Sequence, residues 1–384
     1  MRNTTRPYPR HLDARRRPRL ISRPNPISSP PGRLGLVIVV LCVAAGVAMA
    51  RDLDFSESFR AGGVDTIEVM DHRSTWGLVI RNDIDTEILF EQSGTGRVEF
   101  TLTGEVRSNR RRCLPELQVS DRGGTVRAEI TTCSGPTAFL SMSGEMTLTV
   151  SVPRSWEGSY RVDASSARVI LEEARLATVD LDVSSGRIDI GELEADEVEL
   201  HSSSGTITAN RIAATGLRAE ASSGELRFGT VEARESILET SSGSIAADQI
   251  ESDVEADAAS GDIRLGFGGR SGRVDAETSS GSIVIEGLDG AVEIDATSGN
   301  VRLDFARLTG DSSIETSSGE LTVTLPEASD FDLDISTSSG NIGVDFPITM
   351  RGDMGSDDVE GSVGNGGPVL ELDSSSGNIR VTRR

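Results

Sequence analysis

Carboxylate side chains recur at two fixed distances before a repeated glycine. Asp or Glu stands four residues before that glycine at eight places and six residues before it at seven. Oxygen ligands without His or Cys favour hard cations, calcium first and magnesium second. We therefore expect weak calcium binding, with a dissociation constant on the order of millimolar, where the carboxylates are densest: Asp257, Asp275, Glu277, Glu293 and Asp295. The alternative is an acidic face that sodium and water solvate and that serves solubility alone. We expect no organic cofactor.

The serine before each repeated glycine, as in Ser241-Ser242-Gly243, is a second candidate for chemistry. A nucleophilic serine needs a base within hydrogen-bond reach. Beyond residue 50 the chain has two histidines, His72 and His201, no lysine and no Gly-x-Ser-x-Gly motif. Ten copies of one serine also argue against a single active site, so we assign no catalytic residue. We expect instead that the glycine permits the bend and that the serine hydroxyls bond to the turn.

Cys113 and Cys133 form a candidate disulfide, because an even number of cysteines in an exported body favours pairing. The residues between them predict a hairpin that turns at 121–124. If a three-residue loop pairs Asp121 with Thr125, the same register places Cys113 opposite Cys133.

The elements that must position these residues are set by the repeat itself. A small residue, Ser, Gly, any residue and an aliphatic residue recur ten times between residues 184 and 377, and the first nine glycines are 18 to 21 residues apart. Apolar residues stand two and four after the glycine and five before it. Alternation on both sides of a bend predicts two short strands per coil, each with one face inward. The fold class is therefore all-β: a single-chain parallel β-solenoid, or β-helix, of about ten coils.

The chain divides into six segments by its pattern. We predict a basic leader over 1–33, an apolar segment over 34–50, an irregular antiparallel β cap over 51–155 and the solenoid over 156–349. A Gly- and Asp-rich loop over 350–368 and a terminal strand pair over 369–384 complete the prediction.

The first fifty residues predict export. Residues 1–33 carry a charge of +8 and the next seventeen carry none. Residues 51–384 therefore carry −31, since the whole chain has a net charge of −23. The apolar run ends in Ala48-Met49-Ala50, which fits a signal peptide. Its alternative is an uncleaved anchor that tethers the body to the inner membrane. Either outcome places the acidic body in the periplasm or on the cell surface.

Together with Val150-Ser151-Val152-Pro153, Leu325-Pro326 and Ser375-Ser376-Gly377-Asn378-Ile379, the repeats resemble the bacterial "putative adhesin" family of exported β-solenoid proteins, a domain of unknown function. The resemblance covers roughly residues 60–384. It implies a fold and an envelope location, and it brings no catalytic residues. The chain departs from the pattern at Ala167, which replaces the first glycine, and in its long basic leader.

These observations favour a non-enzymatic envelope or surface protein, either adhesin-like or a scaffold. The alternatives are a polysaccharide-active β-helix enzyme with outward carboxylates as acid and base, or an accessory protein that senses envelope stress. The expected partner is an unidentified envelope or surface component. Nucleic acid is excluded, because an acidic body repels phosphates.

Overall fold

The computed structural model describes residues 38–39, 51–58, 64–71, 80–94, 96–108, 114–131, 140–350 and 357–384. The basic leader, all of the apolar segment except Ile38 and Val39, and both Cys113 and Cys133 lie outside these residues. All the regular structure in these ranges is β-strand. They contain no helix long and apolar enough to cross a membrane.

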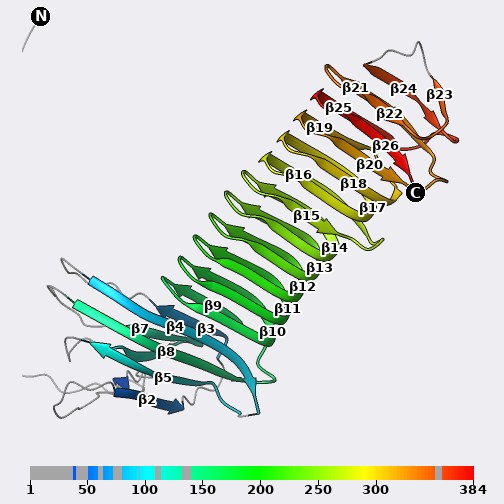
Figure 1. Ribbon diagram of the computed structural model, residues 1–384. Helices are drawn as coiled ribbons and strands as arrows, with labels where there is room; N and C mark the ends of the chain where they lie inside the picture. Colours follow the sequence, from blue (N-terminus) through cyan, green and yellow to red (C-terminus); the bar gives the residue numbers. More distant parts are fainter. Residues whose placement is uncertain are drawn as a thin grey trace, which may run out of the picture. The chain divides into compact units, whose positions relative to one another are not determined.

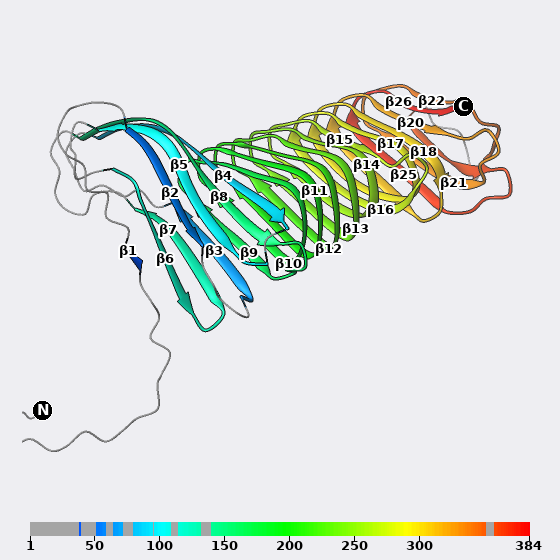
Figure 2. The ribbon, with the colours of Figure 1, turned by 90° about the horizontal axis from the view of Figure 1, so that it is seen from below.

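Parallel coils follow one another in a row from residue 168 onward (Figures 1 and 2). Each strand pairs in parallel with the same stretch of the next coil, as in Ile188↔Ile207 and Ile207↔Leu226. This pairing confirms the predicted β-solenoid. The strands of the row are β10 (Arg168–Val183), β11 (Arg187–Ser202), β12 (Thr206–Ala221), β13 (Leu226–Thr240), β14 (Ile245–Ala258), β15 (Ile263–Gly266), β16 (Ser271–Ser280), β17 (Ile283–Ser298), β18 (Val301–Leu308), β19 (Ser312–Ser318) and β20 (Leu321–Leu325).

The first coils of this row differ from the prediction of two short strands each. From β10 to β14 a single strand of 14 to 16 residues runs from one Ser-Ser-Gly turn to the next. It can continue through the second corner because that corner also holds an inward apolar residue, such as Leu193 or Ile250, both 1% exposed. The coils divide into two strands only further along the row, as in β15 and β16.

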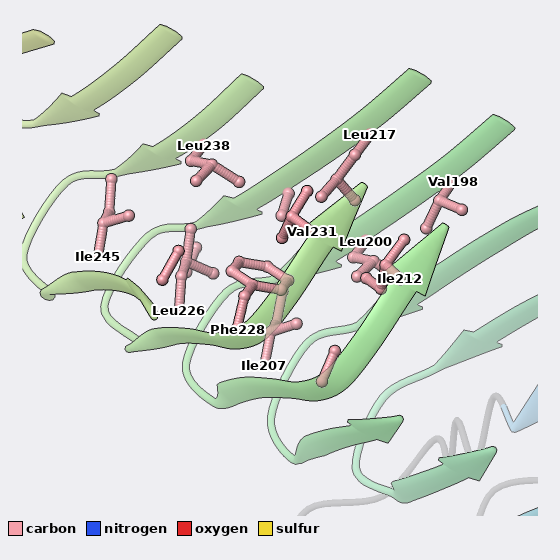
Figure 3. Packing of buried hydrophobic residues seen from close by; sticks show 14 of the residues in the cluster. Val198, Leu200, Ile207, Ile212, Leu217, Leu226, Phe228, Val231, Leu238 and Ile245 are labelled. Atoms are coloured by element: carbon pink, nitrogen blue, oxygen red, sulfur yellow. The ribbon is translucent and has the colours of Figure 1, made fainter. Parts of the chain in front are cut away.

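The core lies inside the coils and follows the predicted columns. Ile207, Leu226 and Ile245, two residues after successive glycines, are at most 1% exposed. Leu200 and Leu238, five residues before a glycine, are buried to the same degree. Figure 3 shows these side chains pointing into the same interior from successive coils. Each coil therefore covers the apolar side chains of its neighbours, and a solenoid is stabilised mainly by these contacts between adjacent coils.

The Ser-Ser-Gly turn owes its glycine to close approach between coils. A Cβ added to Gly243 would overlap the carbonyl oxygen of Gly224 in the preceding coil, and Gly224 stands in the same relation to Gly205. The predicted reason, backbone freedom at the bend, applies at Gly299 and Gly319, whose φ angles are 148° and 149°. At the other repeats the limiting factor is the space for a side chain.

Buried hydroxyl groups reach the turn from the position three residues before the glycine. Thr240 Oγ1 donates to the Gly224 carbonyl at 3.3 Å, and Thr278 Oγ1 donates to the Ala258 carbonyl at 2.8 Å. Both threonines are buried and stand three residues before a glycine. The two residues between them and the glycine, as in Ser241-Ser242, are exposed. At this buried position, two residues before the serine that was expected to bond to the turn, hydroxyls bond to the backbone in some coils, whereas those of Ser202, Thr316 and Ser374 have no hydrogen-bond partner.

The cap is a mixed sheet rather than an antiparallel one. Its strands are β2 (Arg51–Ser58), β3 (Thr66–Asp71), β4 (Ile80–Ser93), β5 (Glu99–Ser108), β6 (Glu116–Arg122), β7 (Thr125–Thr131), β8 (Leu140–Pro153) and β9 (Ser159–Ala164), with the short β1 (Ile38–Val39) beside β6. β4 and β9 extend the parallel pairing of β10, and β8 and β3 continue it by one further strand each. Antiparallel pairs occur beyond them, in β2–β5, β5–β8 and β6–β7. The prediction missed the parallel part because these strands lack the glycine turn that marks a coil.

The β6–β7 hairpin has a shorter loop than predicted. Arg122 pairs with Thr125 across a two-residue turn of Gly123 and Gly124, whose φ angles are 64° and 95°. Positive φ at both positions defines the tight hairpin turn that matches the twist of the strands. The register is therefore shifted by one residue from the one that placed Cys113 opposite Cys133.

The disulfide stays a prediction, since both cysteines lie outside the described residues. Non-reducing digestion and mass spectrometry of freshly exported protein should find a peptide in which Cys113 is joined to Cys133. Such a link typically contributes about 2–4 kcal/mol, so reduction should lower the melting temperature of the cap. Alkylation of both thiols without prior reduction would contradict it.

The C-terminal coils do not lie in chain order. The strands are β21 (Phe331–Thr337), β22 (Ile342–Val344), β23 (Ile348–Met350), β24 (Asp358–Val363), β25 (Val369–Ser376) and β26 (Ile379–Arg383). β25 lies between β19 and β21, and β26 lies between β20 and β22 (Figure 1). β24, inside the predicted loop 350–368, pairs antiparallel with β21 and β23. The predicted terminal strand pair is thus an inserted coil, and part of the predicted loop forms β24, which lies between β21 and β23.

Candidate functional site

One face of the solenoid carries the predicted carboxylates in two columns. On the strand before each Ser-Ser-Gly turn, the residues four and six before the glycine alternate with buried residues, so they point outward together. We call the surface formed by these two columns the acidic face. Parallel pairing sets each residue beside its counterpart in the next coil. The first column runs through the pairs His201↔Glu220, Glu220↔Glu239, Glu239↔Asp257, Asp257↔Glu277, Glu277↔Asp295, Asp295↔Glu315 and Glu315↔Asp373.

A groove follows the acidic face beside the turns. Its first part has a volume of about 610 Å³ and extends from Asp182 to Asp295. A second hollow of about 360 Å³ continues from Asp295 to Asp373. The carboxylates of the first column form one wall, and the small residues of the turns, such as Ser203, Ser222 and Ser241, form the other. The groove therefore offers oxygen atoms on both sides along about ten coils.

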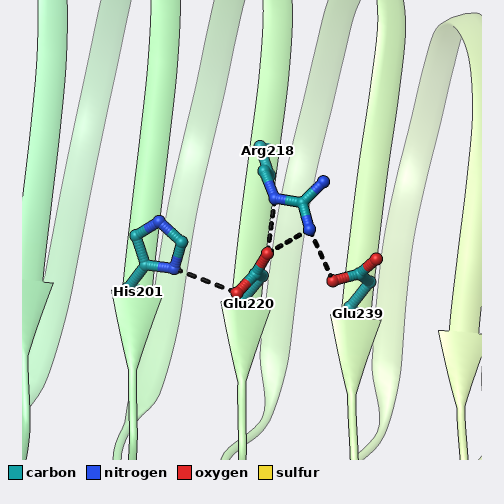
Figure 4. Close-up of polar contacts among 4 residues, drawn as sticks. All are labelled: His201, Arg218, Glu220 and Glu239. Atoms are coloured by element: carbon teal, nitrogen blue, oxygen red, sulfur yellow. Dashed lines mark hydrogen bonds and ion pairs between the residues drawn. The ribbon is translucent and has the colours of Figure 1, made fainter.

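Positive charge compensates one end of the acidic face. Arg218 forms ion pairs with Glu220 and, at 2.9 Å, with Glu239, and His201 Nδ1 lies 3.2 Å from Glu220 (Figure 4). Burial disfavours the charged form of Glu220, but the hydrogen bond and charge of Arg218 outweigh it and lower the pKa of Glu220. His201 thus has a carboxylate neighbour in the next coil. Arg218 thus compensates Glu220 and Glu239, and His201 lies beside Glu220.

Charge is poorly compensated where the column continues. Burial, followed by repulsion from Glu277, Glu255 and Glu239, raises the pKa of Asp257 to about 6. Burial and the charge of Glu293 also raise the pKa of Asp275. Carboxylate oxygens of Glu239, Glu255 and Asp257 lie within 4.8 Å of one another. This is the arrangement in which a shared cation would lower the repulsion most.

The five predicted ligands lie on the acidic face, but they are not its tightest cluster. Asp257, Glu277 and Asp295 follow one another in the first column, and Asp275 and Glu293 are neighbours in the second. Only Asp257 belongs to the triad with Glu239 and Glu255, and Glu293 is instead paired with Arg273 at 2.9 Å. The sequence signal for Glu255 was its place in the column six before glycine. No sequence signal indicated that Glu239 would turn toward it.

Neutralising Asp257 tests this electrostatic picture. Asp257→Asn should raise the melting temperature at pH 7.5 by about 1–3 °C, a small shift because the side chain is partly exposed. The pKa of about 6 in the folded protein lies above the ordinary 3.8, so the folded state binds the proton more tightly than the unfolded chain. The wild type should therefore gain stability as the pH falls from 7.5 through 6 toward 4, and the variant should gain less.

The control for this substitution is Asp189→Asn. Asp189 forms an ion pair with Arg168 at 2.6 Å, so its loss should not stabilise the protein. Melting curves of the three proteins between pH 4 and 7.5 check both expectations. An Asp257→Asn variant with the wild-type pH dependence would contradict the assigned repulsion.

The fold and this face define the class of protein: a parallel β-solenoid with a grooved, acidic side. The family follows from the sequence. The family model described as Toastrack DUF4097 matches residues 77–286 and 217–382, so the chain belongs to this family. The match confirms the resemblance stated on the repeats. No curated protein matches the chain.

Solved structures similar to this chain share little of its sequence. A "putative adhesin" from Bacteroides fragilis is 12% identical, with a TM-score of 0.33, and the match covers 88% of this chain and all of that one. A "putative cell adhesion protein" from Clostridium sporogenes is 9% identical, with a TM-score of 0.18, and the match covers 87% of this chain and all of that one.

Proposed function

We propose that this protein is an exported, non-enzymatic component of the cell envelope or surface, adhesin-like or a scaffold, and that it acts through its acidic face. The observation that carries the proposal is the length of this face: carboxylates line the groove from Asp182 to Asp373 in every coil except those of His201 and Ser336. A face repeated coil by coil suits a long or multivalent partner, because several weak contacts add up to strong attachment. The adhesion-related names of the solved structures agree with this role.

The uniformity of the columns favours binding over catalysis. A catalytic pair of carboxylates needs two groups in different environments, one protonated and one ionised. Among the described carboxyl groups, only that of Asp257 has its pKa raised to about 6. Its neighbours are carboxylates at the same two positions of the repeat. Turnover of any member of a panel of polysaccharides, abolished by Asp257→Asn, would establish the enzyme alternative.

Attachment assays with charge variants test the surface function. Cells that lack the protein should attach less to host or abiotic surfaces, and re-expression should restore attachment. Replacing Asp275, Glu277, Glu293 and Asp295 by their amides should reduce attachment to nearly the level of the deletion. The control carries the same charge change at the opposite corner, in four exposed residues outside the acidic face: Glu172, Glu173, Glu192 and Glu194. Equal attachment by the two variants would contradict a role for the acidic face.

The partner chemistry that fits the face is cationic, and the smallest candidate is calcium. We expect calcium to bind weakly around Asp257, Asp275, Glu277, Glu293 and Asp295, and the geometry adds Glu239 and Glu255 to this set. Carboxylate-only sites of low rigidity bind calcium with dissociation constants on the order of millimolar. Millimolar calcium should therefore raise the melting temperature above that in sodium chloride of the same ionic strength.

Asp257→Asn removes a member of the triad and should reduce the calcium-specific rise, whereas Asp189→Asn should leave it unchanged. Equal melting temperatures in calcium and sodium would leave the acidic face as a solubility device.

A further inference from the structure

The C-terminal coil lies between two coils that precede it in the chain. We call β19 with β20 the acceptor coil, β25 with β26 the inserted coil, and β21 with β22 the distal coil. The inserted coil pairs in parallel with the acceptor coil on one side and with the distal coil on the other. From β10 to β20 each coil pairs with the coil that follows it in the chain.

The acceptor and distal coils present the same positions of the repeat to the inserted coil, although the residue types differ at some of them. Glu371 of the inserted coil pairs with Ser313 on one side and with Asp334 on the other. Leu372 likewise pairs with Ile314 on one side and with Ile335 on the other, and all three side chains are fully buried. The turn glycines also stack in this order, because Gly340 approaches the carbonyl oxygen of Gly377, and Gly377 approaches that of Gly319. Removing the inserted coil would therefore bring two complementary edges into the same register.

Chain order gives the distal coil the first access to the acceptor edge. Phe331 follows the end of the acceptor coil at Leu325 much more closely than Val369 does, so the distal coil closes the shorter loop during synthesis and during refolding alike. An unpaired strand edge recruits any strand that can add to it, and the distal coil is the first one available. We propose that the C-terminal coil enters last, into a shorter array in which the distal coil is stacked directly on the acceptor coil, so that this end of the solenoid closes by strand insertion.

The inserted arrangement has contacts that the shorter array lacks. Leu370, Leu372, Ile379 and Val381 are all fully buried. Arg380 pairs with Glu320 at 2.8 Å, and Arg384 reaches past the acceptor coil to Asp304 at 2.7 Å. The backbone N–H of Val369 donates to Asp311 Oδ1 at 2.9 Å. These contacts favour insertion once residues 369–384 are available, which makes the shorter array an intermediate.

Thiol crosslinking during refolding distinguishes the two arrangements. One full-length variant carries Ser313→Cys with Asp334→Cys, and the other carries Ser313→Cys with Glu371→Cys. A short bis-thiol reagent that spans one coil-to-coil distance, about 4.8 Å, is added at set times after dilution from denaturant. Peptide mass spectrometry identifies each link and separates it from reactions of the native cysteines. We expect the 313–334 link to appear first and then decline, while the 313–371 link rises.

Gly377→Ala provides a matched test in the folded protein. A Cβ at this position would overlap the Gly319 carbonyl oxygen, so it should block insertion and leave the shorter array intact. The 313–334 link should then dominate at equilibrium, with the melting of the preceding coils unchanged. Gly340→Ala should not have this effect, because the distal coil needs its glycine in both arrangements.

The proposal fails if the 313–334 link never rises above its native level during refolding and in Gly377→Ala. It also fails if the 313–371 link forms mainly within covalent dimers, because insertion would then come from a second copy of the chain.

Discussion

Replacing Gly243 by alanine should lower the melting temperature of the solenoid by about 6–12 °C, which corresponds to about 3 kcal/mol for an array of this size. The added Cβ would overlap the carbonyl oxygen and approach the carbonyl carbon of Gly224. Both atoms belong to the backbone of the neighbouring coil, so no side-chain rotation relieves the clash. The two coils would have to separate, and their strand pairing on both sides of the turn would weaken.

The control is Gly343→Ala in β22. A Cβ at position 343 would contact only Arg380 Cγ, at an ordinary 3.9 Å. This substitution should leave the melting temperature within about 2 °C of the wild type, since it also lowers the entropy of the unfolded chain. Circular dichroism melts of the two variants give the comparison. Similar melts would contradict close approach as the reason for the repeated glycine.

The columns of the coil could be predicted from the sequence because they depend on local alternation. Ile188, Ile263 and Leu321, all two residues after a glycine, are fully buried, as are Leu181 and Ala276 five residues before one. Strand periodicity alone places such residues on one side of the chain. The neighbouring coil then only has to repeat the pattern, which it does at nearly constant spacing.

The order of the last coils could not be predicted, because local alternation does not distinguish one coil from another. Ile314, Ile335 and Leu372 occupy equivalent columns, so the alternation is satisfied whichever coil is in the middle. Contacts between distant residues, such as the ion pair of Arg384 with Asp304, distinguish the two orders and have no local signal. The parallel pairing in the cap could not be predicted because its strands lack a repeated turn. Strands such as β4 and β8 pair in parallel, but no motif in the sequence indicates this.

The sequence predicted which carboxylates lie on the acidic face, but not how close their side chains are to one another. Asp257, Asp275 and Glu277 lie on the acidic face because outward positions follow from the register. The closeness of Glu239 to Glu255 and Asp257 depends on side-chain orientation, and the compensation by Arg218 depends on its reach to the next coil. Neither property can be derived from spacing along the chain.

Replacing Ile283 by aspartate should have the largest effect of any single change in the array. Ile283 is fully buried, and it pairs with Ile263 and Val301, which are at most 1% exposed. The variant would bury a carboxylate without a partner and remove a large apolar side chain. Such combined losses exceed about 4 kcal/mol, enough to separate the two neighbouring coils of the variant.

Ser282→Asn is the matched control, one residue earlier and partly exposed, because Asn300 already occupies the equivalent position in the next coil. It should melt like the wild type. In a solenoid each coil is stabilised mainly by its neighbours, so a break at Ile283 should divide the array rather than unfold all of it. We therefore expect Ile283→Asp to melt in two steps, with the coils of β10 to β14 surviving the first. A single transition at the wild-type temperature would contradict the inward position of Ile283 and the register of the whole row.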